Sequence, residues 1–137
     1  MKKTFCIFFL LLTLVIGVYA QEDKKPEITF EKTTHNFGSF KESDGPVTCV
    51  FKFTNTGKNV LVIHQAIAAC GCTVPIFPKE PIKPGESSEI KVTYNGKGRR
   101  AGEFEKTITI RSNTKAQIHR LKIKGSMIGK KSLSINP

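Results

Sequence analysis

Short stretches in which apolar and polar residues alternate are the feature that most constrains the fold of this chain. Between residues 47 and 54, Val47, Cys49, Phe51 and Phe53 occupy every second position, and polar residues fill most of the gaps. A period of two places the apolar side chains on one face, so the pattern predicts a half-buried β-strand. The same period recurs in residues 90–94, 103–111 and 121–124, with Lys106 interrupting the second of these.

Turn-forming residues separate these stretches at the intervals expected of a sandwich of short strands. They are Asn55–Asn59, the pair Pro84-Gly85, which fits the centre of a type II turn, and Ser112–Lys115, which predicts a hairpin. Further strands are predicted at Ile28–Phe30, His35–Phe40 and Val60–Ile67, the last of them central because it is almost continuously apolar.

About seven strands without helical periodicity predict an all-β, Ig-like β-sandwich over residues 28–126, followed by a tail at 127–137. The chain has no tryptophan, so the buried Trp of antibody domains is excluded and only the broader Ig-like class is supported.

The first 20 residues have the parts of a secretory signal peptide. Lys2 and Lys3 give a basic start, an apolar run extends from Phe5 to Val18, and Ala20 precedes Gln21 at the predicted cleavage site. We therefore predict export to the periplasm or the extracellular space, with a disordered polar leader at 21–27. Gln21 is not a cysteine, so a lipoprotein is not expected. An uncleaved anchor is the alternative, but the run is short for a membrane span, and no span is expected after cleavage.

The chain is strongly basic, with a formal net charge of +11. Lys2 and Lys3 would leave with the signal peptide, so the mature charge would be 11 − 2 = +9. An exported basic protein meets anionic lipids or acidic glycans rather than nucleic acid. The simplest interpretation is a charged surface that keeps the protein soluble. The partner is expected to be an unknown protein or an anionic surface of the envelope or the cell exterior.

One loop concentrates positive charge. Residues 96–102 read Gly-Lys-Gly-Arg-Arg-Ala-Gly and are superficially similar to a phosphate-binding loop. A strand and not a helix is predicted to follow, so the helix N-terminus that binds phosphate is missing. We predict a flexible hairpin loop, in which Lys97, Arg99 and Arg100 are candidates for contact with an anionic partner.

Four prolines recur at every third position from Pro75 to Pro84. This spacing suits a polyproline II ligand, but it also suits a crossover between sheets that proline keeps out of strand pairing. The crossover is favoured because Ile76, Phe77 and Ile82 are interleaved as expected of inward-pointing anchors.

Several motifs together resemble one bacterial family, catalogued as domain of unknown function 1573. They are His35-Asn36-Phe37-Gly38, the segment Phe51–Gly57, Cys70-Gly71-Cys72-Thr73 and the segment Ile82–Glu86 with Ile90-Lys91-Val92. The resemblance covers about Ile28 to Gly125. It implies an exported Ig-like, Hydin-like sandwich and implies no activity or cofactor.

The cysteines leave the covalent structure open. After signal cleavage the chain holds Cys49, Cys70 and Cys72, an odd number for an exported protein. The simplest assignment buries Cys49 as a free thiol and bonds Cys70 to Cys72 across Gly71. A cross-link from Cys49 to Cys70 or Cys72 is the alternative, because their strands are predicted hairpin partners.

The same Cys70-Gly71-Cys72 motif suggests two functional alternatives. A closely spaced dithiol could exchange disulfides, or it could bind copper or zinc with His64 or Met127 completing the set of ligands. His35 and His119 are predicted to be capped or on the surface. No catalytic constellation is visible, so we predict a non-enzymatic binding or structural module, with the thiol-exchange or metal-binding protein as the alternative.

Overall fold

The apolar faces of the alternating stretches bring eight short strands together in two sheets. The computed structural model describes residues 24–130. The predicted signal peptide, with its cleavage site at Ala20 and Gln21, lies outside the described residues, as do residues 131–137. The elements are β1 (Ile28–Phe30), β2 (Thr34–Lys41), the 3-10 turn η2 (Glu42–Asp44), β3 (Val47–Asn55), β4 (Ile63–Ala68), β5 (Thr73–Ile76), β6 (Ser87–Tyr94), β7 (Gly102–Ser112) and β8 (Ile118–Ile128).

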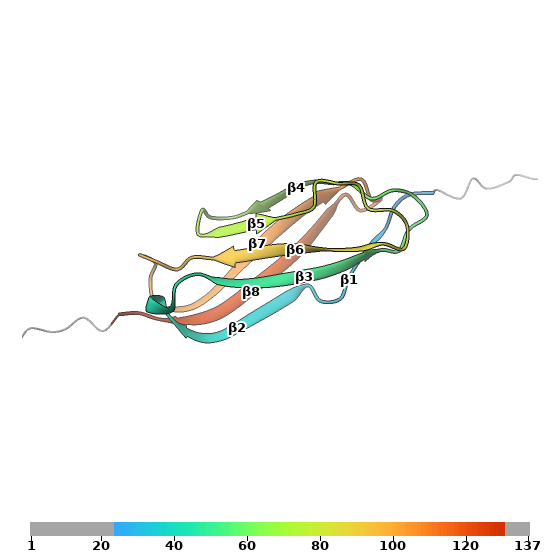
Figure 1. Cartoon of the computed structure of the whole chain (residues 1–137). Helices are drawn as coiled ribbons and strands as arrows, with labels where there is room; N and C mark the ends of the chain where they lie inside the picture. The colour runs from blue at the N-terminus through green and yellow to red at the C-terminus, as the bar shows by residue number, and fades with distance from the viewer. Residues whose placement is uncertain (1–23, 131–137) are drawn as a thin grey trace, which may run out of the picture.

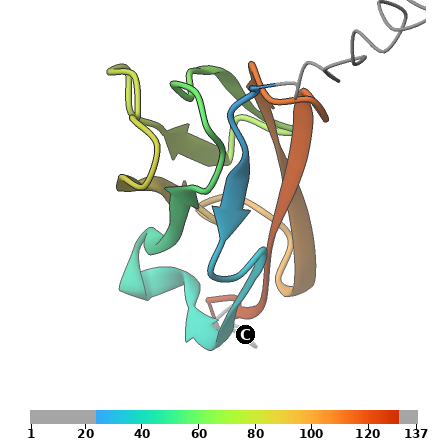
Figure 2. The ribbon, with the colours of Figure 1, turned by 90° about the vertical axis from the view of Figure 1, so that its right-hand side faces the viewer.

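The strands form two four-stranded layers. One sheet, called sheet A, has the order β1-β3-β6-β5, and the other, called sheet B, has the order β2-β8-β7-β4. All neighbours are antiparallel except β2 and β8, which pair in parallel. Figure 1 shows the two layers stacked, and Figure 2 shows β8, in red, at one side of the molecule with β1, in blue, beside it. The predicted all-β, Ig-like sandwich is confirmed.

The core lies between the inner faces of the two sheets. Eight side chains from β3, β6, β7 and β8 are at most 1% exposed: Phe51, Phe53, Ile90, Val92, Ile108, Ile110, Leu121 and Ile123. All of them belong to the alternating stretches of the sequence. Each such side chain contributes about 1.5–3 kcal/mol when it is fully buried, so these faces supply the main force that holds the layers together.

The turn chemistry is also as expected. Gly85 has a φ of +81°, and the N–H of Glu86 donates to the carbonyl of Lys83 at 3.0 Å, as in a type II turn centred on Pro84 and Gly85. The predicted hairpin joins β7 to β8, where the N–H of Ser112 donates to the carbonyl of Gln117 at 2.9 Å.

The domain extends slightly beyond the predicted limits. Within the predicted leader, Pro26 is buried, and the carbonyl of Glu27 accepts a hydrogen bond from the N–H of Thr56 at 2.9 Å. At the other end, β8 continues to Ile128, two residues past the predicted boundary, and Met127 near its end is buried.

The stretch Val60–Ile67 was predicted to be a central strand, and that prediction is wrong. It contains β4, which is an edge strand of sheet B and pairs only with β7. Leu61 is buried because it bridges to Ile82 across the side of the sandwich, whereas Val60 and Ile67 are exposed. Within the run, only Leu61 and Ile63 are buried, so most of its apolar residues lie at least partly exposed along the edge of the sandwich.

The proline segment begins as a strand, which differs from the prediction. Thr73–Ile76 forms β5 at the edge of sheet A, paired with β6, and this raises the strand count to eight. The Cys72 carbonyl accepts the N–H of Asn95 at 2.7 Å, so the alternation of antiparallel bonding turns the backbone of Pro75 toward the free edge. A proline is tolerated there because no N–H is required.

Two of the three predicted anchors in this segment point inward. Ile82 is buried and Phe77 packs against the core, as predicted. Ile76 is 60% exposed, because the alternation along β5 places it on the outer face of sheet A.

A buried amide fastens three connections at the end of the sandwich where the described chain begins. Asn55 has no exposed surface, and its Nδ2 donates to the carbonyls of Asn59 at 2.8 Å and Ile82 at 2.9 Å. Its Oδ1 accepts from the N–H of Gly57 at 3.0 Å and of Glu27 at 3.4 Å. One side chain therefore satisfies backbone groups from the leader, the β3–β4 connection and the proline segment.

Asn55→Ala is expected to lower the free energy of unfolding by about 2–3 kcal/mol, because it removes these bonds and leaves a void. Asn113→Ala is a matched control, since Asn113 also bonds the backbone twice, to the N–H of Val62 and the carbonyl of Val60, but is exposed. It should cost about 1 kcal/mol or less. Urea unfolding of both variants measures the difference, and equal losses would contradict the role given to Asn55.

Candidate functional site

A disulfide joins Cys70 and Cys72 in the connection between β4 and β5. Their Cα atoms are 5.3 Å apart, with the exposed Gly71 between them. Cys72 is buried and Cys70 is half-buried. The hydroxyl oxygen of Thr73 lies 3.6 Å from the sulfur of Cys72 and 3.8 Å from that of Cys70. The motif thus forms a compact covalent loop whose more accessible sulfur belongs to Cys70.

Cys49 is a free thiol in the core. It lies on β3 opposite Val92 of β6, which in turn lies opposite Pro75 of β5. Two interstrand spacings, about 9.6 Å, therefore separate Cys49 from β5, and this exceeds the roughly 7 Å between Cα atoms that a disulfide allows. The predicted hairpin partnership is also wrong, because β3 belongs to sheet A and β4 to sheet B.

The structure does not bring the proposed metal ligands together. His64 is exposed near the start of β4, beside Arg111 and Asn113, whereas Cys70 follows the end of that strand. The extended part of the chain between them, from His64 to Ala68, alone spans roughly 13 Å. Met127 is buried beneath Gly96. Within residues 24–130 no group of three His, Cys, Asp or Glu side chains is arranged to hold a metal ion.

The two remaining histidines each have a local partner. His35 lies 3.0 Å from the amine of Lys32, and the Nε2 of His119 lies 2.9 Å from the hydroxyl of Thr114. Burial lowers the pKa of both imidazoles, and the charge of Lys32 lowers the pKa of His35 further. Both rings are therefore mainly neutral at pH 7 and serve local contacts.

The basic loop connects β6 to β7 and crosses from sheet A to sheet B, so it is not the predicted hairpin loop. A turn forms in which the N–H of Arg99 donates to the carbonyl of Gly96 at 2.9 Å, with Gly98 at a φ of +73°. Lys97, Arg99 and Arg100 are all exposed. In the described part of the chain, none of these three cations forms an ion pair.

Two backbone N–H groups of this loop donate hydrogen bonds to neighbouring connections. The N–H of Asn95 donates to the carbonyl of Cys72 at 2.7 Å, which ties it to the disulfide loop. The N–H of Gly98 donates to Oε1 of Glu42 at 3.2 Å, which ties it to η2. We call these three connections, residues 42–46, 69–72 and 95–101, the basic end; they lie together at the left of Figure 1.

The carboxylates at the basic end are engaged with backbone groups. Glu42 accepts the N–H of Gly98, and Asp44 accepts the N–H of Lys41 at 3.0 Å. Among the described residues neither acid forms an ion pair with Lys97, Arg99 or Arg100, and the three cationic side chains are exposed. Sequence reasoning missed the contact of Glu42, since it joins residues 56 positions apart and has no local signal. The Asn95-Gly96 pair is a turn signal that could have located the start of the loop.

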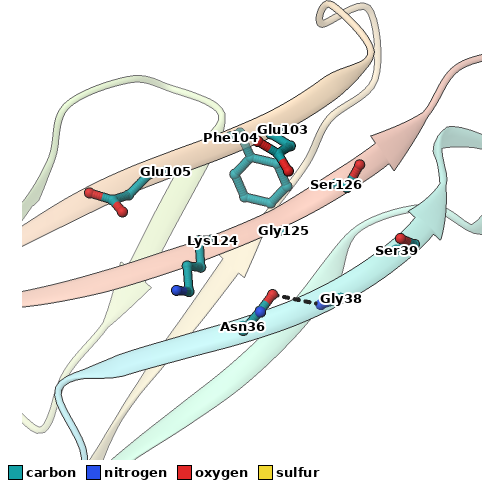
Figure 3. Close-up of a pocket in the computed structure, with 9 residues that line it drawn as sticks. All are labelled: Asn36, Gly38, Ser39, Glu103, Phe104, Glu105, Lys124, Gly125 and Ser126. Atoms are coloured by element: carbon teal, nitrogen blue, oxygen red, sulfur yellow. Dashed lines mark hydrogen bonds between the residues drawn. The ribbon is translucent and has the colours of Figure 1, made fainter.

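A second feature is a shallow depression of about 540 Å³ on the outer face of sheet B, shown in Figure 3. It forms at the register shift of β2 between Asn36 and Ser39, where Gly38 has a φ of +67° and donates its N–H to Oδ1 of Asn36 at 2.9 Å. The His35-Asn36-Phe37-Gly38 motif thus shapes a strand irregularity. Glu103, Glu105 and Lys124 line the other side.

The free thiol yields a direct prediction for a protein that begins at Gln21. Burial raises the pKa of Cys49 to about 11, so at pH 8 its thiol is protonated as well as inaccessible, and iodoacetamide requires the thiolate. Mass spectrometry should find no alkylation of the folded protein, one modified thiol after unfolding, and three after unfolding and reduction. Modification of Cys70 in the unfolded, unreduced protein would contradict the disulfide.

Solved structures are similar to the chain in fold. A crystal structure of a protein of unknown function from Porphyromonas gingivalis W83 has a TM-score of 0.64 and 19% identity, covering 80% of this chain and 51% of that one. The seventh PapD-like domain of human CEP192 has a TM-score of 0.63 and 8% identity, with coverage of 85% and 95%. A chain of the CsuC–CsuE chaperone–tip adhesion subunit complex of Acinetobacter baumannii has a TM-score of 0.53 and 12% identity, covering 74% of this chain and 57% of that one.

These identities are low enough that the likeness concerns the fold alone, and the chain spans about half the length of the P. gingivalis protein. No helix within residues 24–130 is long and apolar enough to cross a membrane. No curated protein matches the sequence. The family model described as protein of unknown function (DUF1573) matches residues 28–127, which is 100 of the 137 residues, and the chain therefore belongs to the DUF1573 family.

Proposed function

We propose that the protein is an exported, non-enzymatic binding module that uses its basic end to hold an anionic component of the cell envelope or exterior. The observation that carries the proposal is that the basic loop is hydrogen-bonded to the disulfide loop and to η2, while its side chains Lys97, Arg99 and Arg100 are exposed. A binding surface of this kind needs cations that are held in place and are not neutralised by neighbours.

The basic loop is preorganised, which raises its affinity for a partner. A free loop loses conformational entropy when a partner orders it, and this cost reduces affinity. Here the N–H groups of Asn95 and Gly98 already hold the loop against its neighbours, and the disulfide restrains the connection that accepts one of those bonds. Recognition by loops on a rigid sandwich is a common arrangement.

Export is supported by the apolar segment and cleavage motif in residues 1–20. The CsuC–CsuE structure, a chaperone in complex with a tip adhesion subunit of Csu pili, is an example of a similar fold in a partner complex. The local partners of His35 and His119 and the burial of Cys49 support a non-enzymatic role.

Thiol–disulfide exchange and metal binding have less support. Exchange requires an accessible sulfur and a good leaving thiol, but Cys72 is buried and only Cys70 is half-exposed. A metal site would need His64 or Met127, but His64 lies near the opposite end of β4 and Met127 is buried beneath Gly96.

The test compares two variants of equal charge on a heparin column, which serves as a polyanion probe. In a protein that begins at Gln21, Lys97→Ser/Arg99→Ser/Arg100→Ser removes the loop cations. Lys24→Ser/Lys83→Ser/Lys115→Ser removes three exposed lysines remote from the basic end. The first variant should elute at clearly lower salt than the wild type, because contacts to polyanions depend on salt.

The control variant should elute near the wild type. Equal shifts in the two variants would show that retention reflects the net charge of the whole protein, and the basic end would then have no special role.

A further inference from the structure

Exposed apolar side chains lie next to the basic end, on the outer face of sheet A. Val74 is 52% exposed and Ile76 is 60% exposed, and both point outward from β5. In the strand register, Ile76 lies opposite Lys91, and Lys91 lies opposite Val50, which is half-buried. We call Val74 and Ile76 the apolar stripe; Lys91 separates them from Val50. Large apolar side chains grouped on a surface mark sites that contact a protein or a membrane.

The apolar stripe and the basic loop are connected through the same two strands. Val74 is two residues after the disulfide, and it lies opposite Thr93. The basic loop begins at Asn95, two residues after Thr93, and its first N–H bonds to Cys72. Exposed apolar side chains and the exposed cations of the loop therefore both lie within a few residues of a strand pair that the Asn95–Cys72 bond closes.

The edge of β5 beside the stripe is poorly suited to take up a strand from a partner. Pro75 turns its backbone to the free edge and offers no N–H there. The side chains on the face, and not the backbone at the edge, are available for contact. The outer face also carries Lys52 and Lys91 among threonines, with Glu89 opposite Lys52.

We propose that the anionic partner is the surface of a lipid bilayer, with Val74 and Ile76 entering the boundary between head groups and acyl chains while the loop cations bind lipid phosphates. This inference rests on the proposed function, because it uses the same loop. Apolar side chains flanked by cations are the combination by which proteins bind reversibly to the surface of anionic membranes. The positive charge of the loop complements the negative charge of such lipids.

The chain contains no tryptophan, so a single introduced tryptophan reports its own surroundings. Val74→Trp places the reporter in the stripe. Ile118→Trp is the matched control, since Ile118 is an exposed strand residue, 41% exposed, close to the opposite end of the molecule. The protein should begin at Gln21, because the run from Phe5 to Val18 would itself enter a bilayer, and the whole sandwich lies within residues 24–130.

Both variants are mixed with vesicles of phosphatidylglycerol and phosphatidylcholine, with and without brominated acyl chains, and with vesicles of phosphatidylcholine alone. Val74→Trp should shift its emission to the blue and be quenched by the brominated mixed vesicles, whereas Ile118→Trp should do neither. Adding the three loop substitutions should lower the binding constant for the mixed vesicles, measured by sedimentation, on the order of a hundredfold, because each cation contributes about fivefold.

The outcomes separate this inference from the proposed function. If heparin retention depends on the loop but Val74→Trp is not quenched, the inference of a lipid surface is overturned. The partner would then be a soluble acidic macromolecule. If the loop substitutions lower heparin retention no more than the control substitutions do, the proposed function itself is overturned. Equal binding to phosphatidylcholine alone would show that the cations contribute nothing, and would overturn the inference. Near-wild-type urea midpoints for the variants check that folding is intact.

Discussion

The contact between the inner faces of the two sheets is the interaction on which the rest of the structure depends. Phe51, Phe53, Ile90 and Val92 from one sheet meet Ile108, Ile110, Leu121 and Ile123 from the other, and all are excluded from water. A shift of one residue in any of these strands would turn its apolar side chains outward, so burial fixes the register. Fixed registers in turn set where each strand ends, and hence which connections meet at the basic end.

The sequence predicted this part of the structure well because a period of two is a local property of the chain. The strands at Val47–Asn55 and Ser87–Tyr94 and the turn at Pro84-Gly85 all follow from residues close to one another. The edge position of β4 could not be predicted in this way. It depends on the bridge from Leu61 to Ile82, which is a contact across the sandwich, and an apolar run has the same appearance in a central strand and at a corner.

The candidate site was predicted in composition but not in arrangement. The exposed cations of the basic loop and the close pairing of Cys70 with Cys72 could be read from residue types and spacing. The bonds that fasten the loop join Asn95 to Cys72 and Gly98 to Glu42, and such long-range contacts have no local sequence pattern. A ring closed over three residues removes little entropy from the unfolded chain, about 2 kcal/mol or less. The disulfide therefore shapes one connection more than it stabilises the domain.

The described chain begins at one end of the sandwich and finishes at the other, beside the basic end (Figure 1). Strands β7 and β8 have 11 residues each and run along most of that length, which corresponds to roughly 37 Å. The point at which the described chain begins, Lys24, is therefore held at a set distance from the loop that carries Lys97, Arg99 and Arg100. The sandwich acts as a rigid spacer, and its reach is determined by strand length and not by a linker.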